Sequence, residues 1–217
     1  NLASGMMAGI TSPTRPWFRL SIAGFEDSAA SPAVNVWLDE VRKRMMRVFQ
    51  ESNYYSAKAT QFFDLVVFGT APMLIYEDFD NVIRCYNPCA GEYYVASSPE
   101  LKIDSFYREF VMTVKQVVQK WGIANCTESV QVGYRTGGAA WTREIKIAHS
   151  IEPNTGDFPE NPKGWPYREV YWEWGSTDEK TLAINGFHES PANCPRWDLV
   201  SNDSYGRSPA MDALGDI

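Results

Sequence analysis

Apolar side chains follow two different periods along this chain, and the change of period separates helical from extended stretches. Ser31 and Pro32 suit an N-cap followed by proline at the first helical position. Beyond them, apolar residues recur at spacings of three and four, which predicts an amphipathic helix of about 18 residues. Its expected apolar face consists of Val34, Trp37, Leu38, Val41, Met45, Val48 and Phe49.

A second helix is predicted from Tyr54 to Phe68, after a break at Ser52-Asn53. Gly69 is the type of residue that ends helices. We expect the apolar faces of both helices to lie in a core. The face of this second helix is formed by Tyr55, Ala59, Phe62, Phe63, Val66 and Val67.

The period then changes to the alternation of β-strands. Two strands are predicted to flank an acidic turn, residues 78–81, and a third precedes Ser98-Pro99. A long strand follows, and three more are predicted in the second half of the chain. The last two of these could form a hairpin. The expected strands are Pro72–Glu77, Val82–Tyr86, Glu92–Ser97, Leu101–Met112, Arg143–Ile151, Arg168–Trp174 and Thr181–Phe187.

Helix signals also occur among the strands. Thr113 and Gln116 form a capping-box pattern before a short helix that stops at Gly122. Residues 123–140 are poorly patterned, and residues 23–30 and 153–166 are expected loops. Ser208-Pro209 predicts the start of another helix. The order predicts an α+β fold, with an N-terminal helix pair packed on a mostly antiparallel sheet and then a second strand-rich region.

The N-terminal stretch Ala3–Leu20 is rich in small residues, then in proline, then in aromatics. We expect it to be an arm fixed to the rest of the chain, with Trp17 and Phe18 heavily buried. The chain begins without Met and ends in a helical pattern, which indicates a piece of a longer protein.

Composition narrows the function classes. The chain has 217 residues and a net charge of −7, which argues against a generic nucleic-acid binder. The basic residues Arg42, Lys43, Arg44 and Arg47 are expected on a solvated helix face, where Asp39 can pair with Lys43. No apolar run is long enough to cross a bilayer, and no signal peptide is visible.

The residues that could carry chemistry are few. Cys85, Cys89, Cys126 and Cys194 lack zinc spacing, and we expect each to be a buried or half-buried free thiol in a reducing compartment. Asp78 and Asp80 suit turn chemistry, with a metal loop as the alternative. His149 is expected to be a satisfied interior or interface histidine.

Motifs of enzyme active sites do not occur in the sequence. It has no phosphate-binding glycine loop, no zinc-protease motif and no nucleophile elbow. His188-Glu189 lacks the second histidine of a zinc protease. A nucleophile assembled in space from Cys126 or Cys194 and a histidine remains an alternative. The sequence therefore favours a structural or assembly protein, with no enzyme activity, catalytic residue, metal or cofactor.

Five separate stretches, in the same order, resemble the portal (head-to-tail connector) proteins of tailed bacteriophages of the short-tailed kind. They begin with Gly5, Met6 and Gly9 leading into the run TSPTRPWF. The others are the two-helix segment ending in Phe68-Gly69-Thr70-Ala71, the segment YREFVMTVKQVVQKWG, the residues Pro195-Arg196-Trp197, and YGRSP at 205–209. Together they span nearly the whole chain.

The resemblance implies a ring, usually of twelve copies, at one capsid vertex in the virion, assembled in the host cytoplasm. Double-stranded DNA passes through its channel during packaging and ejection. The implied partners are other copies of the chain, the terminase large subunit, the major capsid and scaffolding proteins, and tail adaptor proteins, with no membrane. DNA-contacting residues are unknown, because the family's later wing, channel loop and crown have no counterpart here.

The resemblance also implies a division of the chain. Residues 1–112 would be a wing-like α+β region, 113–122 a stem-like helix, 123–203 a clip-like strand-rich region, and 204–217 the start of a returning stem helix. Tyr171, Trp172, Trp174 and Trp165 suit a subunit interface, with ordinary core as the alternative. The rival function is a soluble α+β enzyme or ligand-binding domain with a site assembled in space.

Overall fold

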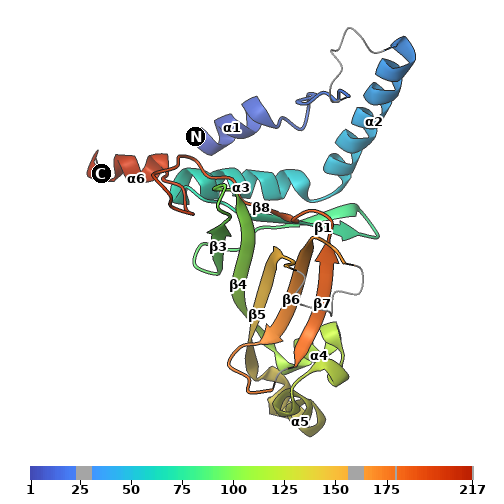
Figure 1. The fold of residues 1–217 in the computed structure, drawn as a ribbon, viewed down its shortest axis with the longest axis vertical. Helices are drawn as coiled ribbons and strands as arrows, with labels where there is room; N and C mark the ends of the chain where they lie inside the picture. The colour runs from blue at the N-terminus through green and yellow to red at the C-terminus, as the bar shows by residue number, and fades with distance from the viewer. Residues whose placement is uncertain (23–30, 156–163, 179, 217) are drawn as a thin grey trace. The chain divides into compact units, whose positions relative to one another are not determined.

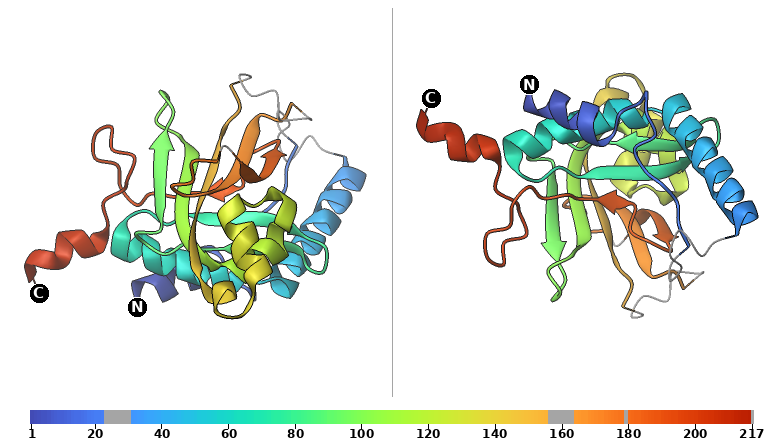
Figure 2. Two further views of the ribbon diagram at one scale, coloured as in Figure 1. Left: turned by 90° about the horizontal axis from the view of Figure 1, so that it is seen from below. Right: turned by 90° about the horizontal axis from the view of Figure 1, so that it is seen from above.

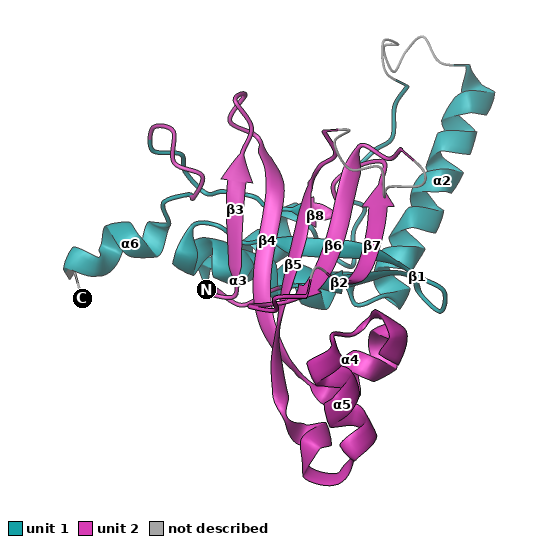
Figure 3. Cartoon of the chain, turned by 60° about the horizontal axis from the view of Figure 1, so that its bottom comes forward, with its two compact units in different colours: residues 1–87, 193–200, 206–217 teal, residues 88–192, 201–205 magenta. Residues whose placement is uncertain are grey.

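The computed structural model describes residues 1–22, 31–155, 164–178 and 180–216, and these form helices and antiparallel sheets (Figure 1). The predicted α+β class is confirmed. The chain divides into two compact units, coloured separately in Figure 3. Unit 1 comprises residues 1–87, 193–200 and 206–217, and unit 2 comprises residues 88–192 and 201–205. Both units are therefore discontinuous in sequence.

Unit 1 begins with three helices, α1 (Leu2–Ile10), α2 (Pro32–Glu51) and α3 (Tyr54–Phe68). The hydroxyl of Ser31 accepts the N–H of Val34, so the predicted N-cap of α2 is confirmed. Gly69 ends α3 in the left-handed conformation, with φ 78°, as its sequence position predicts. Both views in Figure 2 show α2 at one end of α3, extending away from it.

The unit 1 sheet has the order β2-β1-β8, formed by β1 (Met73–Asp78), β2 (Val82–Tyr86) and the two-residue β8 (Ala192–Asn193). The predicted hairpin is confirmed, because β1 and β2 pair antiparallel. α3 packs against this sheet through Tyr54 and Ala57, which meet Met73 and Cys85. Trp17, from the N-terminal arm, packs on this core and stacks on Tyr54 at a centroid distance of 6.4 Å.

Asn53 joins the α2–α3 corner to the edge of this sheet. Its side-chain amide donates to the carbonyl of Cys85 and accepts the N–H of Cys85, each at 2.8 Å. The amide thus pairs with the outer backbone groups of β2 in place of another strand. This contact fixes where α3 begins relative to the hairpin.

The last part of unit 1 returns to the end of α3. Gly69 and Gly206 cross so closely that a Cβ added to Gly69 would lie 2.2 Å from the carbonyl oxygen of Gly206. Gly206 donates its N–H to the hydroxyl of Thr70 at 2.7 Å. The hydroxyl of Ser208 then caps α6 (Pro209–Ala213), as predicted, before the short turn η3 (Leu214–Asp216).

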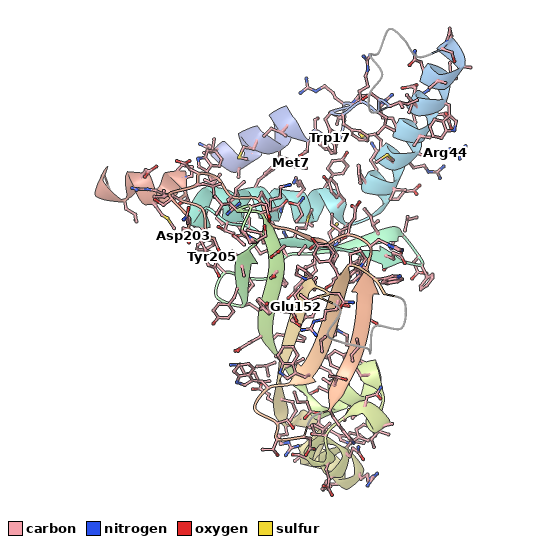
Figure 4. The ribbon with its side chains drawn as sticks, in the orientation of Figure 1. Met7, Trp17, Arg44, Glu152, Asp203 and Tyr205 are labelled. Atoms are coloured by element: carbon pink, nitrogen blue, oxygen red, sulfur yellow. The ribbon has the colours of Figure 1, made fainter. Side chains whose placement is uncertain are left out.

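Unit 2 is built on a five-stranded antiparallel sheet whose order follows the sequence, β3-β4-β5-β6-β7. Tyr205 binds the outer edge of β3, where its hydroxyl accepts the N–H of Val95 at 3.2 Å (Figure 4). The strands are β3 (Tyr93–Ser97), β4 (Ile103–Thr113), β5 (Glu144–Pro153), β6 (Tyr167–Glu173) and β7 (Thr181–Phe187). The predicted β6–β7 hairpin is confirmed.

Helices between β4 and β5 cover one end of this sheet. They are α4 (Val114–Trp121), η1 (Ile123–Asn125), α5 (Glu128–Thr136) and η2 (Gly138–Thr142). The predicted capping box of α4 is confirmed, with both reciprocal bonds between Thr113 and Gln116. Val114, Val117 and Val130 are fully buried against the sheet.

Two helices were not predicted. The arm Ala3–Leu20 begins with α1, whose glycines and serine are weak helix formers. Residues 123–140, which look poorly patterned, contain α5 between two short 3₁₀ turns. In both places tertiary packing outweighs intrinsic preference. Trp17 and Phe18 are half-buried, so the expectation of heavy burial was too strong.

The predicted helix faces are wrong at several positions. On α2, Trp37 and Met45 are exposed, whereas Met46, outside the predicted face, is buried. On α3, Ala59 and Phe63 are exposed. The residues that α3 buries are Tyr54, Ala57, Gln61, Phe62 and Leu65. Helix periodicity locates the apolar side of a helix only approximately. The contacts within the fold decide which side is buried.

Some predictions are not tested by the fold. The expected loop at 23–30 and most of that at 153–166 lie outside the described residues. The wing, stem and clip portions stay a prediction, and the two compact units divide the chain at other residues.

Candidate functional site

The most concentrated group of ionisable side chains is a buried network across the sheet of unit 2. The Nε of Arg108 donates to Nδ1 of His149 at 3.0 Å, and Nε2 of His149 lies 2.9 Å from the carboxylate of Glu169. Tyr171 and Asn185 donate to the same carboxylate. Arg108, His149 and Glu169 are 8%, 0% and 3% exposed.

The donors fix where the proton of His149 lies. Because Arg108 can only donate, Nδ1 of His149 must accept, so Nε2 carries the proton and donates to Glu169. Burial lowers the pKa of His149 despite the nearby Glu169 carboxylate. The pKa of Glu169 is also lowered: burial alone would raise it, but the hydrogen bond from His149 and further donors outweigh burial. The pair is therefore a neutral imidazole and a carboxylate.

This network suits a structural role. His149 is wholly enclosed, and its ring nitrogens bind Arg108 and Glu169, so no substrate reaches it. The expectation that His149 is a satisfied interior histidine is confirmed. Its partners were missed, because they lie 41 and 20 residues away and no local motif links them.

A second buried carboxylate holds the start of α5. Glu173 accepts the N–H of Thr127 at 2.9 Å and its hydroxyl at 2.6 Å. Asp178 accepts the N–H of Glu128 at 3.4 Å. These residues line a groove of about 790 Å³. The carboxylates of Glu173 and Asp178 therefore already bind the N–H groups of Thr127 and Glu128, so these two donors are not available to an anion.

The cysteines do not form a nucleophilic site. All four are free thiols. Burial raises the pKa of Cys126 to about 11 and that of Cys194 to about 12. The Cys126 thiol donates to the carbonyl of Gly122, not to a histidine. Cys85 is buried, as expected, but Cys89 is exposed, so the expectation of burial was wrong for Cys89.

The remaining histidine and the carboxylate pair have ordinary roles. His188 is exposed and packs beside Trp165, with ring centroids 5.3 Å apart. One carboxylate oxygen of Asp78 accepts the N–H of Asp80 and of Asn81, each at 2.9 Å. Turn chemistry is therefore confirmed for Asp78. In the described part of the chain, no group of three His, Cys, Asp or Glu could hold a metal.

The basic residues of α2 are paired within the helix. Lys43, Arg44 and Arg47 are exposed, but the side chain of Arg42 is only 16% exposed, so the expected solvated face is wrong for Arg42. Arg42 and Lys43 both bind Asp39, at 2.6 and 2.9 Å, which confirms the predicted Asp39–Lys43 pair. Arg44 pairs with Glu40 and Arg47 with Glu51. Figure 4 shows Trp17 on one side of α2 and Arg44 on the other.

Neither unit carries an excess of positive charge. Unit 1 has ten Lys and Arg against twelve Asp and Glu, and unit 2 has ten against fifteen. A nucleic-acid binder needs a cationic surface to neutralise phosphates. The charge of each unit therefore agrees with a protein that does not hold DNA tightly.

The aromatic residues proposed for an interface have different environments. Tyr171 belongs to the core of unit 2, while Trp172 and Trp165 are half-buried. Trp174 is 53% exposed, beside Lys146. Tyr171 is therefore an ordinary core residue. For Trp174, a place in a subunit interface stays a prediction.

The chain matches known proteins over its whole length. The family model described as "Bacteriophage head to tail connecting protein" matches residues 1–217. The chain is 40% identical to the "Probable portal protein" of Bordetella phage BPP-1 and 39% identical to the "Portal protein" of Salmonella phage epsilon15. All of this chain is covered in both comparisons, and it spans 39% of the length of each relative.

Proposed function

Because this chain belongs to the family of bacteriophage head-to-tail connecting proteins, we propose that it acts as a phage portal protein. In this role, copies of the chain form a ring, with twelve copies expected, at one vertex of the capsid. Double-stranded DNA passes through the ring during packaging and ejection, and the tail attaches to it. The observation that carries the proposal is the family match over residues 1–217, joined by the two portal relatives.

The proposed role is structural and not enzymatic. The buried ionisable groups support this, since Arg108, His149, Glu169 and Glu173 all bind partners within the protein. The high pKa values of Cys126 and Cys194 also disfavour reactive thiolates. We therefore expect no turnover of ATP or DNA by the purified chain.

The net negative charge of both units supports passage of DNA without tight binding. Each phosphate contact that a channel wall keeps adds a barrier to sliding, and acidic surfaces repel phosphates. Both units have more acidic than basic residues. An acidic channel wall would let DNA slide without tight binding.

The proposed partners follow from the role. They are neighbouring copies, the terminase large subunit, the major capsid and scaffolding proteins, and tail adaptor proteins. The proposed location is the portal vertex of the virion, after assembly in the host cytoplasm. No helix among the described residues is long and apolar enough to cross a membrane.

The test compares the complete gene product with the 217-residue chain. We expect electron microscopy and light scattering to detect rings with a central channel for the gene product. The 217-residue chain spans only 39% of the length of its relatives, so we expect it to offer a smaller contact area between copies. It should be mostly monomeric, because interfaces below about 1,000 Å² rarely hold stable assemblies. A complete gene product that stays monomeric at every concentration and salt would refute the portal role.

A further inference from the structure

The helix α2 has an apolar face that the described chain leaves largely open. Val34, Trp37, Val41 and Met45 recur at helical spacing along it. Trp37 is 63% exposed and Met45 37% exposed, and Val34 and Val41 are only half-buried. We call these four residues the α2 face. Large exposed apolar patches on a folded unit mark interaction surfaces.

Basic side chains border the α2 face. Arg44 lies two turns after Trp37 and next to Met45, and its side chain is 78% exposed. Arg47 follows one turn later and is 77% exposed. Their partners Glu40 and Glu51 are also exposed, and such pairs contribute little to stability and exchange readily. The α2 face therefore offers an apolar centre and, beside it, two arginines that can exchange Glu40 and Glu51 for other carboxylates.

The turn between β1 and β2 offers the opposite arrangement. Phe79 is fully exposed, at 107%, and Val82 beside it is 61% exposed. Glu77 and Asp80 are exposed carboxylates on either side of Phe79. We call Glu77, Phe79 and Asp80 the hairpin knob.

The hairpin knob is held in shape before any partner binds. Asp78 accepts two backbone N–H groups of the turn, from Asp80 and Asn81. The backbone bonds of the turn with Asp78 also lower the pKa of that carboxyl, Asn81 more than Asp80. A preorganised aromatic side chain loses little entropy on docking, and buried aromatic anchors dominate interface energies.

We propose that the hairpin knob of one copy docks on the α2 face of a neighbouring copy. Phe79 packs against Trp37 and Met45, and the carboxylates of Glu77 and Asp80 face Arg44 and Arg47. The occupant is a second copy because the knob and the face belong to the same unit, and the carboxylates of the knob are opposite in charge to Arg44 and Arg47. Two different complementary surfaces on one subunit make a head-to-tail contact, which gives a ring when the rotation between copies closes and an open filament when it does not.

This inference rests on the portal role, and the test separates the two. The complete gene product is examined for ring formation by light scattering and electron microscopy. Phe79→Ser and Trp37→Ser should each weaken subunit association about tenfold or more, as expected for anchor residues. Tyr94→Ser is the matched control, because Tyr94 is 56% exposed on β3 and outside both surfaces, so its rings should be normal.

Charge reversal gives a second test, in which the combined variants should regain association. Misfolding of the single variants would not produce such a recovery. The double variant Glu77→Arg/Asp80→Arg should weaken the ring, and so should Arg44→Glu/Arg47→Glu. Combining all four changes should restore association at least partly, because the signs match again. Circular dichroism of each variant in the 217-residue chain checks folding, since all of these side chains are exposed.

The outcomes differ for the two proposals. Wild-type rings in every variant would overturn the knob and face contact and leave the portal role intact. Equal loss of rings in Tyr94→Ser, or an α2 face covered by a segment of the same copy, would also overturn the contact. A gene product that never forms rings would overturn both.

Discussion

His149 makes the folded state sensitive to protonation. Its Nδ1 must stay unprotonated to accept from Arg108, and burial keeps its pKa below the ordinary value of 6.5. Arg108 and the nearby Lys120 both oppose a positive charge on the ring, and Glu169 favours one. Protonation would therefore place an imidazolium against a guanidinium 3.0 Å away and break that hydrogen bond.

We predict that the 217-residue chain loses stability as the pH falls below about 6.5. Because the pKa of His149 is lower in the fold than in the unfolded chain, the unfolded state binds more protons below that value, and acid favours unfolding. Glu169 acts in the same direction at lower pH, because its folded pKa is also lowered. The measurement is the melting temperature between pH 8 and pH 4.

Two glutamine variants separate the contributions. His149→Gln should lower stability at pH 8 by about 1–3 kcal/mol, since buried polar partners lose their hydrogen bonds. It should also flatten the pH dependence between pH 7 and pH 5. His188→Gln is the control variant, at an exposed histidine outside the buried network. An unchanged slope in His149→Gln would contradict the assignment.

Asn53 gives a second prediction for a single residue. Asn53→Ala removes both bonds to the backbone of Cys85, so we expect a loss of about 1–3 kcal/mol in the free energy of unfolding. Asn53→Asp keeps the acceptor for the N–H of Cys85 but sets a carboxylate oxygen against its carbonyl oxygen, so it should not restore wild-type stability. Urea unfolding measures both, and equal stability of Asn53→Ala and wild type would rule out the role of this amide.

Sequence patterns locate residues whose partners are near in the chain. Ser31, Thr113 and Ser208 were predicted as caps because each bonds to an N–H three residues later. Arg108, Glu169 and Glu173 carry the buried polar contacts, and no sequence signal identified them. Their partners come from other strands and helices, and a charged residue in a strand resembles any solvated one until the register is known.

At the scale of elements, Gly69 both ends α3 and lies against the backbone of Gly206 in the returning segment. We predict that Gly69→Ala costs about 2 kcal/mol or more, because φ is 78° and the added Cβ would lie 2.2 Å from the carbonyl oxygen of Gly206. Gly137→Ala is the matched control. Gly137 ends α5 with φ 73°, ψ −167° and open space around it, so backbone strain of about 1–3 kcal/mol applies but no clash does.

Chemical denaturation of both glycine variants measures the difference between them. A larger loss in Gly69→Ala than in Gly137→Ala supports a tight crossing between residues 69 and 206. Equal losses would mean that the returning segment can move aside without cost.

Elements with strong periodicity or caps were predicted, and elements held by packing alone were not. The seven long strands and α2, α3 and α4 follow alternation or helical spacing. α1 and α5 contain glycine and polar residues that favour no helix by themselves. The extent of α2 was predicted, but its buried side was not, because the fold buries Met46 and leaves Trp37 and Met45 exposed.

For the whole molecule, charge leads to a prediction about DNA. The 217-residue chain should bind duplex DNA weakly or not at all at about 0.15 M salt, because little counterion release drives binding. Fluorescence anisotropy with labelled duplex measures this. Binding that appears only at low salt is non-specific and agrees with the prediction, whereas a submicromolar Kd at about 0.15 M salt would contradict it.

The interrupted course of unit 1 has a consequence for synthesis on the ribosome. Residues 1–87 emerge first, but the segments that complete unit 1, at 193–200 and 206–217, emerge only after residues 88–192 of unit 2. Chains leave the ribosome N-terminus first, at about 5–20 residues per second. The nascent α3 must therefore wait several seconds for Gly206 and Ser208, with its C-terminal end open to chaperones, while the five strands of unit 2 are already free to pair.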